Sequence, residues 1–303
     1  MRIVFLDSAI INPGDISWHS IESLGEFHNY PRTAREEITG CLEAADAVFI
    51  DSLAIDRKIM EGLPGLKFIG IAATGFNHVD LEAAKELGIA VANVPSYSTD
   101  AVAQHAVSLL LSVTNQVDTY NDAIVAGEWQ QSEDYTFVKA PVTLLAGKSI
   151  GIVGYGNIGK KVAQIAEALG MTVNVYSHDR EAAIKSDVLS LHCPLNEENA
   201  KMVNEEFINK MKDGAILINT ARGGLVDEKA LAKALSSGKL AGAGLDVLSN
   251  EPPEQDNPLV GLNNCYITPH IAFIPVETRK TVVETCAANL KSFIEDGMLN
   301  RLV

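Results

Sequence analysis

The chain has little positive charge and no long apolar run, and each shortage excludes a class of partner. Only 24 Lys and Arg stand against 39 Asp and Glu, which gives a net charge of −15. Nucleic acids and anionic membrane surfaces attract basic proteins, so neither is expected as a partner. No apolar run approaches the length of a membrane span, and the first residues are expected to form a strand rather than a signal peptide.

Cysteine is also scarce. Cys41, Cys193, Cys265 and Cys286 are scattered, without the C-x-x-C spacing of a zinc or redox site. This usage is typical of small buried side chains in a reducing compartment rather than of disulfides. We therefore expect no bound metal, and we expect the protein to be cytoplasmic.

What the chain does have is length and a regular alternation of apolar runs with helical patterns. Its 303 residues exceed the usual size of a single core, so two domains are expected. Alternation of this kind predicts α/β domains, each a parallel sheet with flanking helices. The strands expected in the first series are 3–6, 47–50, 68–71 and 90–94, and those in the second are 150–153, 172–176, 188–191, 215–219, 242–247 and 266–268.

The second series is expected to be inserted into the first domain. A long helix should begin after the cap cluster Ser98-Thr99-Asp100, and a last helix, 276–293, follows the last strand of the second series. The expected domains are therefore 1–98 plus 274–303, and 99–273. The stretch between 176 and 188 is too short for the third strand of a mononucleotide-binding half. Either that strand is lost, or residues are missing from the sequence.

A glycine-rich stretch, S-I-G-I-V-G-Y-G-N-I-G from Ser149 to Gly159, opens the second series between an expected strand and an expected helix. Gly154 permits a tight turn, Gly156 lets backbone approach a pyrophosphate, and Gly159 lets the helix pack on the strand. The helix N-terminus offers N–H groups to phosphates. The stretch predicts a dinucleotide site that includes Asn157 and Ile158; the alternative is a glycine turn in another α/β fold.

Polar residues follow several later strands of the second series. Arg222 precedes two glycines, Asp246 closes a strand, Glu251 lies in a turn, and His270 ends the segment Thr-Pro-His. Ligands of open α/β sheets bind outside the carboxyl ends of the strands, and a guanidinium matches a carboxylate. A single histidine is more often structural than catalytic. A histidine, a carboxylate and an arginine at strand ends of one sheet are better explained by a shared site.

With these motifs the chain resembles the D-isomer-specific 2-hydroxyacid dehydrogenases over nearly its whole length. Besides the glycine stretch, the shared motifs are A-A-T-G-F-N-H-V-D (72–80), N-V-P-S-Y-S-T-D-A-V-A-Q-H-A (93–106), H-C-P-L (192–195), N-T-A-R-G-G (219–224), L-D-V-L-S-N-E-P-P (245–253) and T-P-H (268–270). Within the family, A-A-T-G-F-N and E-W-Q-Q-S-E-D-Y (128–135) look most like glycerate dehydrogenases, also called hydroxypyruvate reductases. The resemblance implies a Rossmann-type dinucleotide-binding domain inserted in a flavodoxin-like substrate domain.

The resemblance also implies roles for matching residues. Arg222 would hold the substrate carboxylate and polarise the keto group, while Thr74 and Gly75 would hold the other end of the substrate. His270 would be the acid–base, paired with Glu251, and a carboxylate beside imidazolium should raise the histidine pKa above about 6.5. The other residues implied to line the cofactor site are Thr99, His192, Cys193, Pro194, Thr220, Ala221 and Asp246, the last against the nicotinamide carboxamide.

The choice between NAD and NADP depends on the end of the second strand of this series. In an NAD enzyme of this fold an acidic residue at that position binds the ribose hydroxyls, and alignment with the family places Ser177 there. His178 and Arg180 could contact a 2′-phosphate, whereas Asp179 could turn toward a ribose and would repel a phosphate. NAD and NADP both stay open, with a slight lean to NADP.

The function expected is the reduction of a small 2-keto acid, hydroxypyruvate or glyoxylate, to the D-2-hydroxy acid. A D-lactate-type dehydrogenase acting on another 2-keto acid is an alternative on the same machinery. A non-catalytic NAD(H)-sensing module of the same fold is a second alternative, against which the intact set of Arg222, Glu251 and His270 argues. Relatives pair through the long helix and the loop after it (100–133), so a homodimer is implied.

Overall fold

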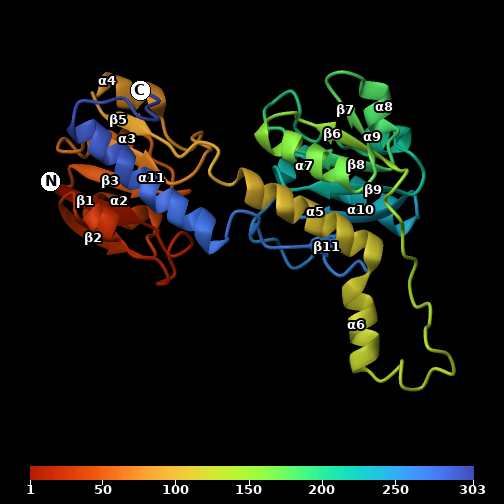
Figure 1. The fold of residues 1–303 in the computed structure, drawn as a ribbon. Coiled ribbons are helices and arrows are strands. Elements are labelled where there is room, and N and C mark those ends of the chain that lie inside the picture. The colour runs from red at the N-terminus through yellow and green to blue at the C-terminus, as the bar shows by residue number, and fades with distance from the viewer. The chain divides into compact units, whose positions relative to one another are not determined.

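The computed structural model describes residues 1–303, which divide into two α/β units (Figure 1). One unit comprises Met1–Ser98 together with Phe273–Val303, and the other comprises Thr99–Ala272. The strands of each sheet pair in parallel, as the alternation of apolar runs and helices predicts. None of the helices combines the length and the apolar character that crossing a membrane would need.

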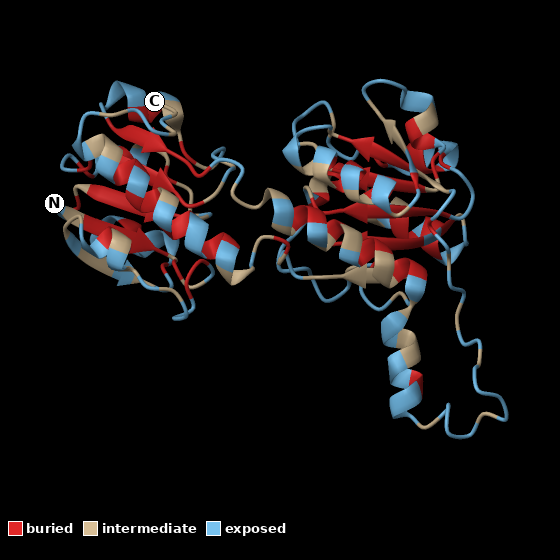
Figure 2. Cartoon of the chain, in the orientation of Figure 1, coloured by how far each residue is buried: buried red, intermediate tan, exposed pale blue.

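The first unit contains a five-stranded sheet in the order β2-β1-β3-β4-β5, which is the flavodoxin-like order. Its strands are β1 (Arg2–Leu6), β2 (Glu26–Tyr30), β3 (Ala47–Ile50), β4 (Phe68–Ile71) and β5 (Ala90–Ala92). Its helices are α1 (His19–Glu22), α2 (Ile38–Cys41), α3 (Arg57–Glu61), α4 (Leu81–Glu86) and α11 (Val276–Ile294), with a 3-10 turn η1 (Arg35–Glu37). Helices cover both faces of the sheet, so the strands β3, β4 and β5 are buried along their whole length (Figure 2).

Strand β2 is absent from the sequence-based expectation. It lies at the edge of the sheet and pairs only with β1, from Arg2 opposite Glu26 to Leu6 opposite Tyr30. Its sequence, E-F-H-N-Y, lacks a continuous apolar run, and two of its residues are exposed. An edge strand of this kind is held by backbone pairing more than by burial, so hydrophobicity does not identify it.

The second unit contains a six-stranded sheet in the order β11-β10-β9-β8-β6-β7. The strands are β6 (Ser149–Val153), β7 (Thr172–Val175), β8 (Val188–Leu191), β9 (Ala215–Asn219), β10 (Leu240–Leu245) and β11 (Cys265–Ile267). The helices are α5 (Thr99–Asn115), α6 (Val117–Val125), α7 (Asn157–Ala168), α8 (Arg180–Ile184), α9 (Glu205–Lys210) and α10 (Glu228–Ser236), with a 3-10 turn η2 (Gly223–Leu225). The fold class expected from the sequence is confirmed.

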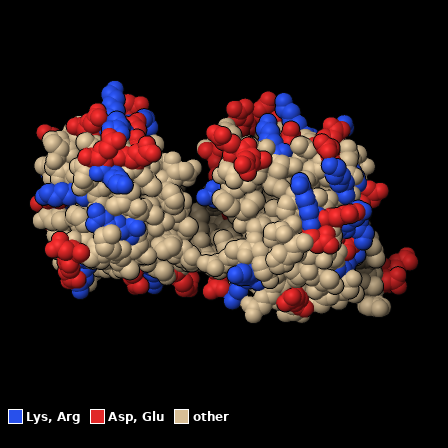
Figure 3. All heavy atoms as spheres, turned by 90° about the horizontal axis from the view of Figure 1, so that it is seen from above, with Lys and Arg blue, Asp and Glu red and all other residues tan.

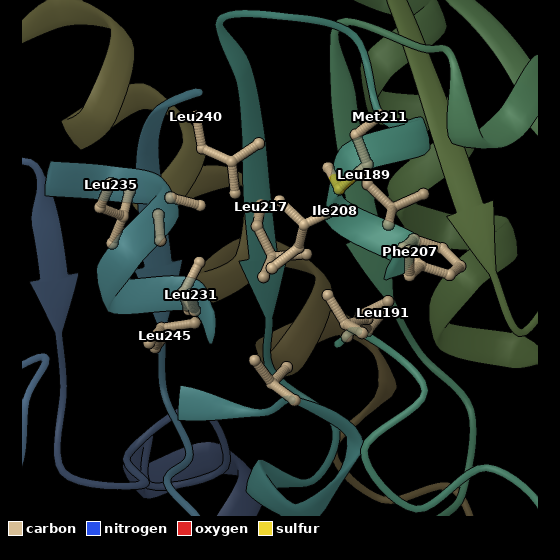
Figure 4. Close-up of a cluster of buried hydrophobic side chains, with 14 of the residues drawn as sticks. Leu189, Leu191, Phe207, Ile208, Met211, Leu217, Leu231, Leu235, Leu240 and Leu245 are labelled. Carbon is tan, nitrogen blue, oxygen red and sulfur yellow. The ribbon is translucent and has the colours of Figure 1, made fainter. Parts of the chain in front are cut away.

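Two apolar layers hold this second sheet. Helices α5 and α7 pack on one face, and α8, α9 and α10 pack on the other. The second layer is formed by side chains that interdigitate between the helices and the strands (Figure 4). It includes Leu189, Leu191, Phe207, Ile208, Met211, Leu217, Leu231, Leu235, Leu240 and Leu245.

The third strand of the mononucleotide-binding half is absent from the fold. Strand β7 forms the edge of the sheet, and the chain crosses from it to β8 through the short helix α8 alone. Asp179 caps the N-terminus of this helix, because its Oδ1 accepts a hydrogen bond of 2.9 Å from the N–H of Ala182. The sheet is therefore of the Rossmann type with its outermost strand removed.

Figure 3 shows how charged side chains are distributed on one side of the molecule. On the side shown in Figure 3, Lys and Arg are interspersed with Asp and Glu. Ion pairs also form along helices, such as Lys185 with Glu181 and Lys210 with Glu206.

Candidate active site

The glycine loop between β6 and α7 requires glycine because backbone segments approach it closely. Gly154 has a φ of +94°, and a Cβ atom on it would lie 2.5 Å from the carbonyl carbon of His192. A Cβ atom on Gly159 would lie 2.1 Å from the carbonyl oxygen of Gly154. Gly156 differs, because nothing lies within 4 Å of the position of its Cβ. The space beside Gly156 is therefore open at the N-terminus of α7, which begins at Asn157.

Two buried polar atoms near this loop lack a partner within the protein. They are Nδ1 of His192, directly after β8, and Oγ1 of Thr220, directly after β9. Burial lowers the pKa of His192 to about 4, so its imidazole is neutral, and its Nε2 lies 2.8 Å from Oγ of Ser190. Unpartnered buried polar atoms are rare in folded proteins. Their position at the carboxyl ends of two strands, beside the open glycine loop, fits a site completed by a dinucleotide.

The end of β7 presents exposed polar side chains, among them Ser177, His178 and Arg180. The guanidinium carbon of Arg180 lies 5.2 Å from the centre of the Tyr176 ring. The carboxylate of Asp179 caps α8. The acidic side chain in this segment is thus engaged with its own helix.

Cys193, Pro194 and Ala221 lie in the loops that follow β8 and β9, as the motifs place them, and Ile158 lies in the first turn of α7. Burial raises the pKa of the Cys193 thiol, so it stays protonated. Thr99 is the first residue of α5.

Arg222 lies in a turn that Asn219 holds in place. Asn219 is fully buried, accepts from the N–H of Ala221 at 3.0 Å and donates from Nδ2 to the carbonyl of Arg222 at 2.9 Å. The guanidinium itself is exposed and donates to the carbonyl of Ala221 at 2.7 Å. The backbone of this turn is thus fixed, while the charged group faces solvent.

The turn that carries Arg222 packs against the loop that carries Glu251. A Cβ atom on Gly223 would lie 1.9 Å from the carbonyl carbon of Leu248, so only glycine permits this approach. Glu251 in turn accepts from the N–H of Leu248 at 2.9 Å through Oε1. These contacts bring two loops from different strands together at one edge of the sheet.

His270 joins this cluster through Glu251. Nδ1 of His270 lies 2.7 Å from Oε2 of Glu251, and this hydrogen bond, against the opposing effect of burial, raises the pKa of His270 above its ordinary value. Burial acts to raise the pKa of Glu251, but the hydrogen bonds from His270 and Leu248 outweigh it, and the pKa of this carboxyl is lowered. The charge of Arg222 also lowers the His270 pKa somewhat, so the two cationic groups lie within each other's field.

Asp246, for which the resemblance implies a contact with nicotinamide, has many partners of its own. It is 1% exposed, and its carboxylate accepts from the N–H groups of Ile271 and Ala272, both at 2.9 Å. In this structure it holds together the turn that carries His270.

Thr74 and Gly75 lie in the other unit, in the loop after β4. Thr74 donates from Oγ1 to the carbonyl of Val94 at 2.9 Å, and its own carbonyl accepts from Nδ2 of the buried Asn93 at 2.8 Å. The Thr74–Gly75 peptide is therefore held in one orientation.

Comparison with known proteins places the chain in a family. Residues 107–272 match the family model described as D-isomer specific 2-hydroxyacid dehydrogenase, NAD binding domain. The chain is 42% identical to a hydroxypyruvate reductase of Blautia hydrogenotrophica, with 99% of both chains covered. It is 36% identical to a glycerate dehydrogenase of Methylorubrum extorquens, with 97% of this chain and 96% of the relative covered.

A solved structure described as acyclic imino acid reductase (Bsp5) in complex with NADPH and D-Arg is also similar. It is 29% identical, covers all of both chains and has a TM-score of 0.85. The chain belongs to the D-isomer specific 2-hydroxyacid dehydrogenase family, which confirms the resemblance seen in the motifs. It is therefore an oxidoreductase that uses a nicotinamide dinucleotide, and the matched residues 107–272 lie within the second unit.

Proposed function

We propose that this enzyme reduces a small 2-keto acid, hydroxypyruvate or glyoxylate, to the D-2-hydroxy acid. The observation that carries the proposal is the His270–Glu251 hydrogen bond of 2.7 Å beside the turn of Arg222. This arrangement would supply a cationic group for the carboxylate and a proton donor for the keto oxygen at one edge of one sheet. The relatives named hydroxypyruvate reductase and glycerate dehydrogenase support this choice of substrate.

The chemistry divides between the cofactor and these side chains. The nicotinamide supplies the hydride when bound. Arg222 leaves the carbonyl of Ala221 and binds the substrate carboxylate with its planar fork. His270 holds a proton on Nε2 and donates it to the keto oxygen, while Glu251 stabilises the imidazolium through Nδ1. We also propose Thr74 and Gly75 as substrate-binding residues.

The first test is a panel of keto acids with NADH and with NADPH, in which turnover is followed as loss of the absorbance of the reduced nicotinamide. We expect turnover with hydroxypyruvate or glyoxylate to exceed turnover with pyruvate. A preference for pyruvate would instead indicate a D-lactate-type enzyme. Tight cofactor binding without any turnover would overturn the proposal in favour of a nucleotide-sensing module.

We propose that the enzyme accepts NADPH. Asp179, the acidic residue able to repel a 2′-phosphate, is engaged at the N-terminus of α8, while Ser177, His178 and Arg180 are exposed beside it. The similar reductase structure with bound NADPH supports this choice. We expect kcat/KM with NADPH to equal or exceed that with NADH in the same panel, and a strong preference for NADH would contradict it.

The pH dependence should report the His270–Glu251 pair. Reduction needs protonated His270, so kcat/KM for the keto acid should fall as pH rises through the raised pKa of His270. Glu251→Gln removes the charge that raises this pKa, so the falling limb should move to lower pH. The reverse reaction needs neutral imidazole, and its rising limb should move in the same direction. Profiles that do not differ between wild type and variant would contradict the assignment.

We further propose a homodimer. The resemblance implies an interface within residues 100–133, and the exposed apolar side chains place the proposed interface on α6 and the segment after it, residues 117–144. Large apolar side chains are exposed throughout this segment, which extends from the sheet of its own unit (Figure 2). They are Val117, Ile124, Val125, Trp129, Tyr135, Val138, Val142 and Leu144. Exposed apolar side chains gathered in one segment are typical of a protein interface.

The dimer proposal is tested by sedimentation of Val125→Asp, a change at a side chain that is 80% exposed. We expect this variant to shift toward monomer. Val260→Asp is the matched control, because Val260 is 56% exposed and lies outside the segment. Loss of the dimer in both variants, or in neither, would contradict the proposed interface.

The four unpaired cysteines support the cytoplasm as the compartment we propose.

A further inference from the structure

Helix α5 packs directly against the backbone of strand β10, because two glycines of the strand face it. A Cβ atom on Gly242 would lie 2.6 Å from Cγ1 of Val113, and one on Gly244 would lie 2.8 Å from Cβ of Leu109. Four residues of helix advance about 6 Å, and two residues of strand advance about 6.6 Å. The same stagger places His105, one turn before Leu109, beside Asp246 at the end of β10.

The contacts of His105 agree with this stagger. Its Nε2 lies 2.8 Å from Oγ1 of Thr268 and 3.3 Å from Oδ1 of Asp246. The hydroxyl of Thr268 donates its single proton to Oδ1 of Asp246 at 2.6 Å. Its oxygen must then accept from His105, so Nε2 of His105 carries a proton. This tautomer follows from the hydrogen-bond network.

Asp246 is ionised in its buried position. Burial acts to raise its pKa, but the hydrogen bonds from His105 and Thr268, and those from the backbone, outweigh it and lower the pKa. A buried carboxylate is stable only while such donors surround it. His105 is therefore part of what keeps this charge in the interior.

Asp246 in turn fixes the backbone on either side of His270. The N–H of His270 donates to the carbonyl of Asp246 at 2.8 Å, and the next two N–H groups, of Ile271 and Ala272, donate to its carboxylate. His270 adopts a φ of +54°, in the left-handed region that a non-glycine residue rarely occupies. Such a conformation persists where its surroundings hold it.

We propose that His105 is a positioning residue for His270, which it fixes through Thr268 and Asp246. The expected fall in kcat on loss of His105 rests on the proposed function, because it assumes that His270 transfers the proton. The expected displacement of the His270 ring from Glu251 on loss of His105 does not rest on that function.

The kinetic test compares His105→Leu with His105→Gln. Leucine fills the space without a donor, whereas the amide nitrogen of glutamine can reach the position of Nε2. A misplaced catalytic group costs up to about 100-fold in rate, so we expect kcat to fall about tenfold or more in the leucine variant. The glutamine variant should recover most of this loss, and both should bind NADPH with a dissociation constant within about twofold of wild type.

The second measurement does not depend on turnover. Histidine labelled with ¹³C in the ring is titrated by NMR to follow the pKa of His270, which Glu251, Asp246 and Arg222 all influence. We expect His105→Leu to lower this pKa and His105→Gln to restore it. Thr268→Val and Thr268→Ser form a second pair of the same design if the leucine variant does not fold.

The outcomes separate the two proposals. An unchanged His270 pKa and kcat in His105→Leu, or in Thr268→Val, would overturn the positioning role. A wild-type protein that reduces no keto acid, but whose His270 pKa still falls in these variants, would support the positioning role and overturn the proposed function.

Discussion

Replacing His270 with alanine should lower kcat for keto-acid reduction by about 1,000-fold while leaving the affinity for NADPH within about twofold of wild type. General acid catalysis by a placed side chain contributes about 10²- to 10⁴-fold. The Nδ1 atom of His270 is engaged by Glu251 at 2.7 Å, so Nε2 is the nitrogen proposed to carry the proton to substrate. Alanine removes this proton donor but leaves the glycine loop unchanged. Steady-state kinetics and cofactor fluorescence titration measure the two quantities.

The chain offers a matched control for this substitution. His28 lies on the edge strand β2 and forms a similar contact, 2.8 Å from Nε2 to Oε1 of Glu26. His28→Ala should leave kcat unchanged, because this pair lies outside the proposed site. If His270→Ala retained near wild-type turnover, or if both variants lost activity equally, His270 would not be the acid.

The parts of the fold that the sequence predicts well are those in which local signals agree. At the glycine loop, an apolar run, a three-glycine turn and an amphipathic helix follow one another, and strand β6, the turn and α7 form at those positions. The buried strands β3, β4, β8 and β9 have the expected bounds, because continuous apolar runs identify strands covered on both faces. Strands β10 (Leu240–Leu245) and β11 (Cys265–Ile267) both begin and end earlier than expected, and β5 ends two residues earlier, at Ala92.

The edges of the sheets are less predictable. Strand β2 has too little apolar character to be identified, and helix α6 keeps exposed apolar residues such as Val117 and Val125, so no buried stripe identifies it. The short connection after β7 indicates that a strand could be missing. Only the pairing of the strands, with β7 at the edge of the sheet, shows that this strand is absent.

The sequence identifies residues at the ends of strands, but it does not predict which residues far apart along the chain are in contact. Arg222, Glu251 and His270 all follow strands of one sheet, and the structure brings their loops together. His105 received no role from the sequence. It meets Thr268, 163 positions away, because Gly242 and Gly244 let α5 approach β10. Such an approach depends on tertiary packing, which local patterns do not contain.

Arg222→Lys should lower kcat/KM for the keto acid by about 10- to 150-fold. A lysine keeps the positive charge but offers a single ammonium in place of the planar fork that matches a carboxylate. Losing one charge-assisted hydrogen bond of this kind costs about 1.5–3 kcal/mol, which corresponds to that range. The backbone of the turn should not change, because Asn219 holds it through Ala221 and through the carbonyl of residue 222.

The division of this loss between KM and kcat reports what Arg222 does. A rise in KM alone would mean that the guanidinium only binds the carboxylate, whereas a fall in kcat as well would mean that it also polarises the keto group. We expect both, because one planar group beside His270 can contact the carboxylate and the neighbouring carbonyl. Arg57→Lys is the control, since Arg57 pairs with Glu86 at 2.8 Å on the surface of the other unit. Equal losses in the two variants would indicate a general effect of the substitution, and no loss in Arg222→Lys would exclude the clamp.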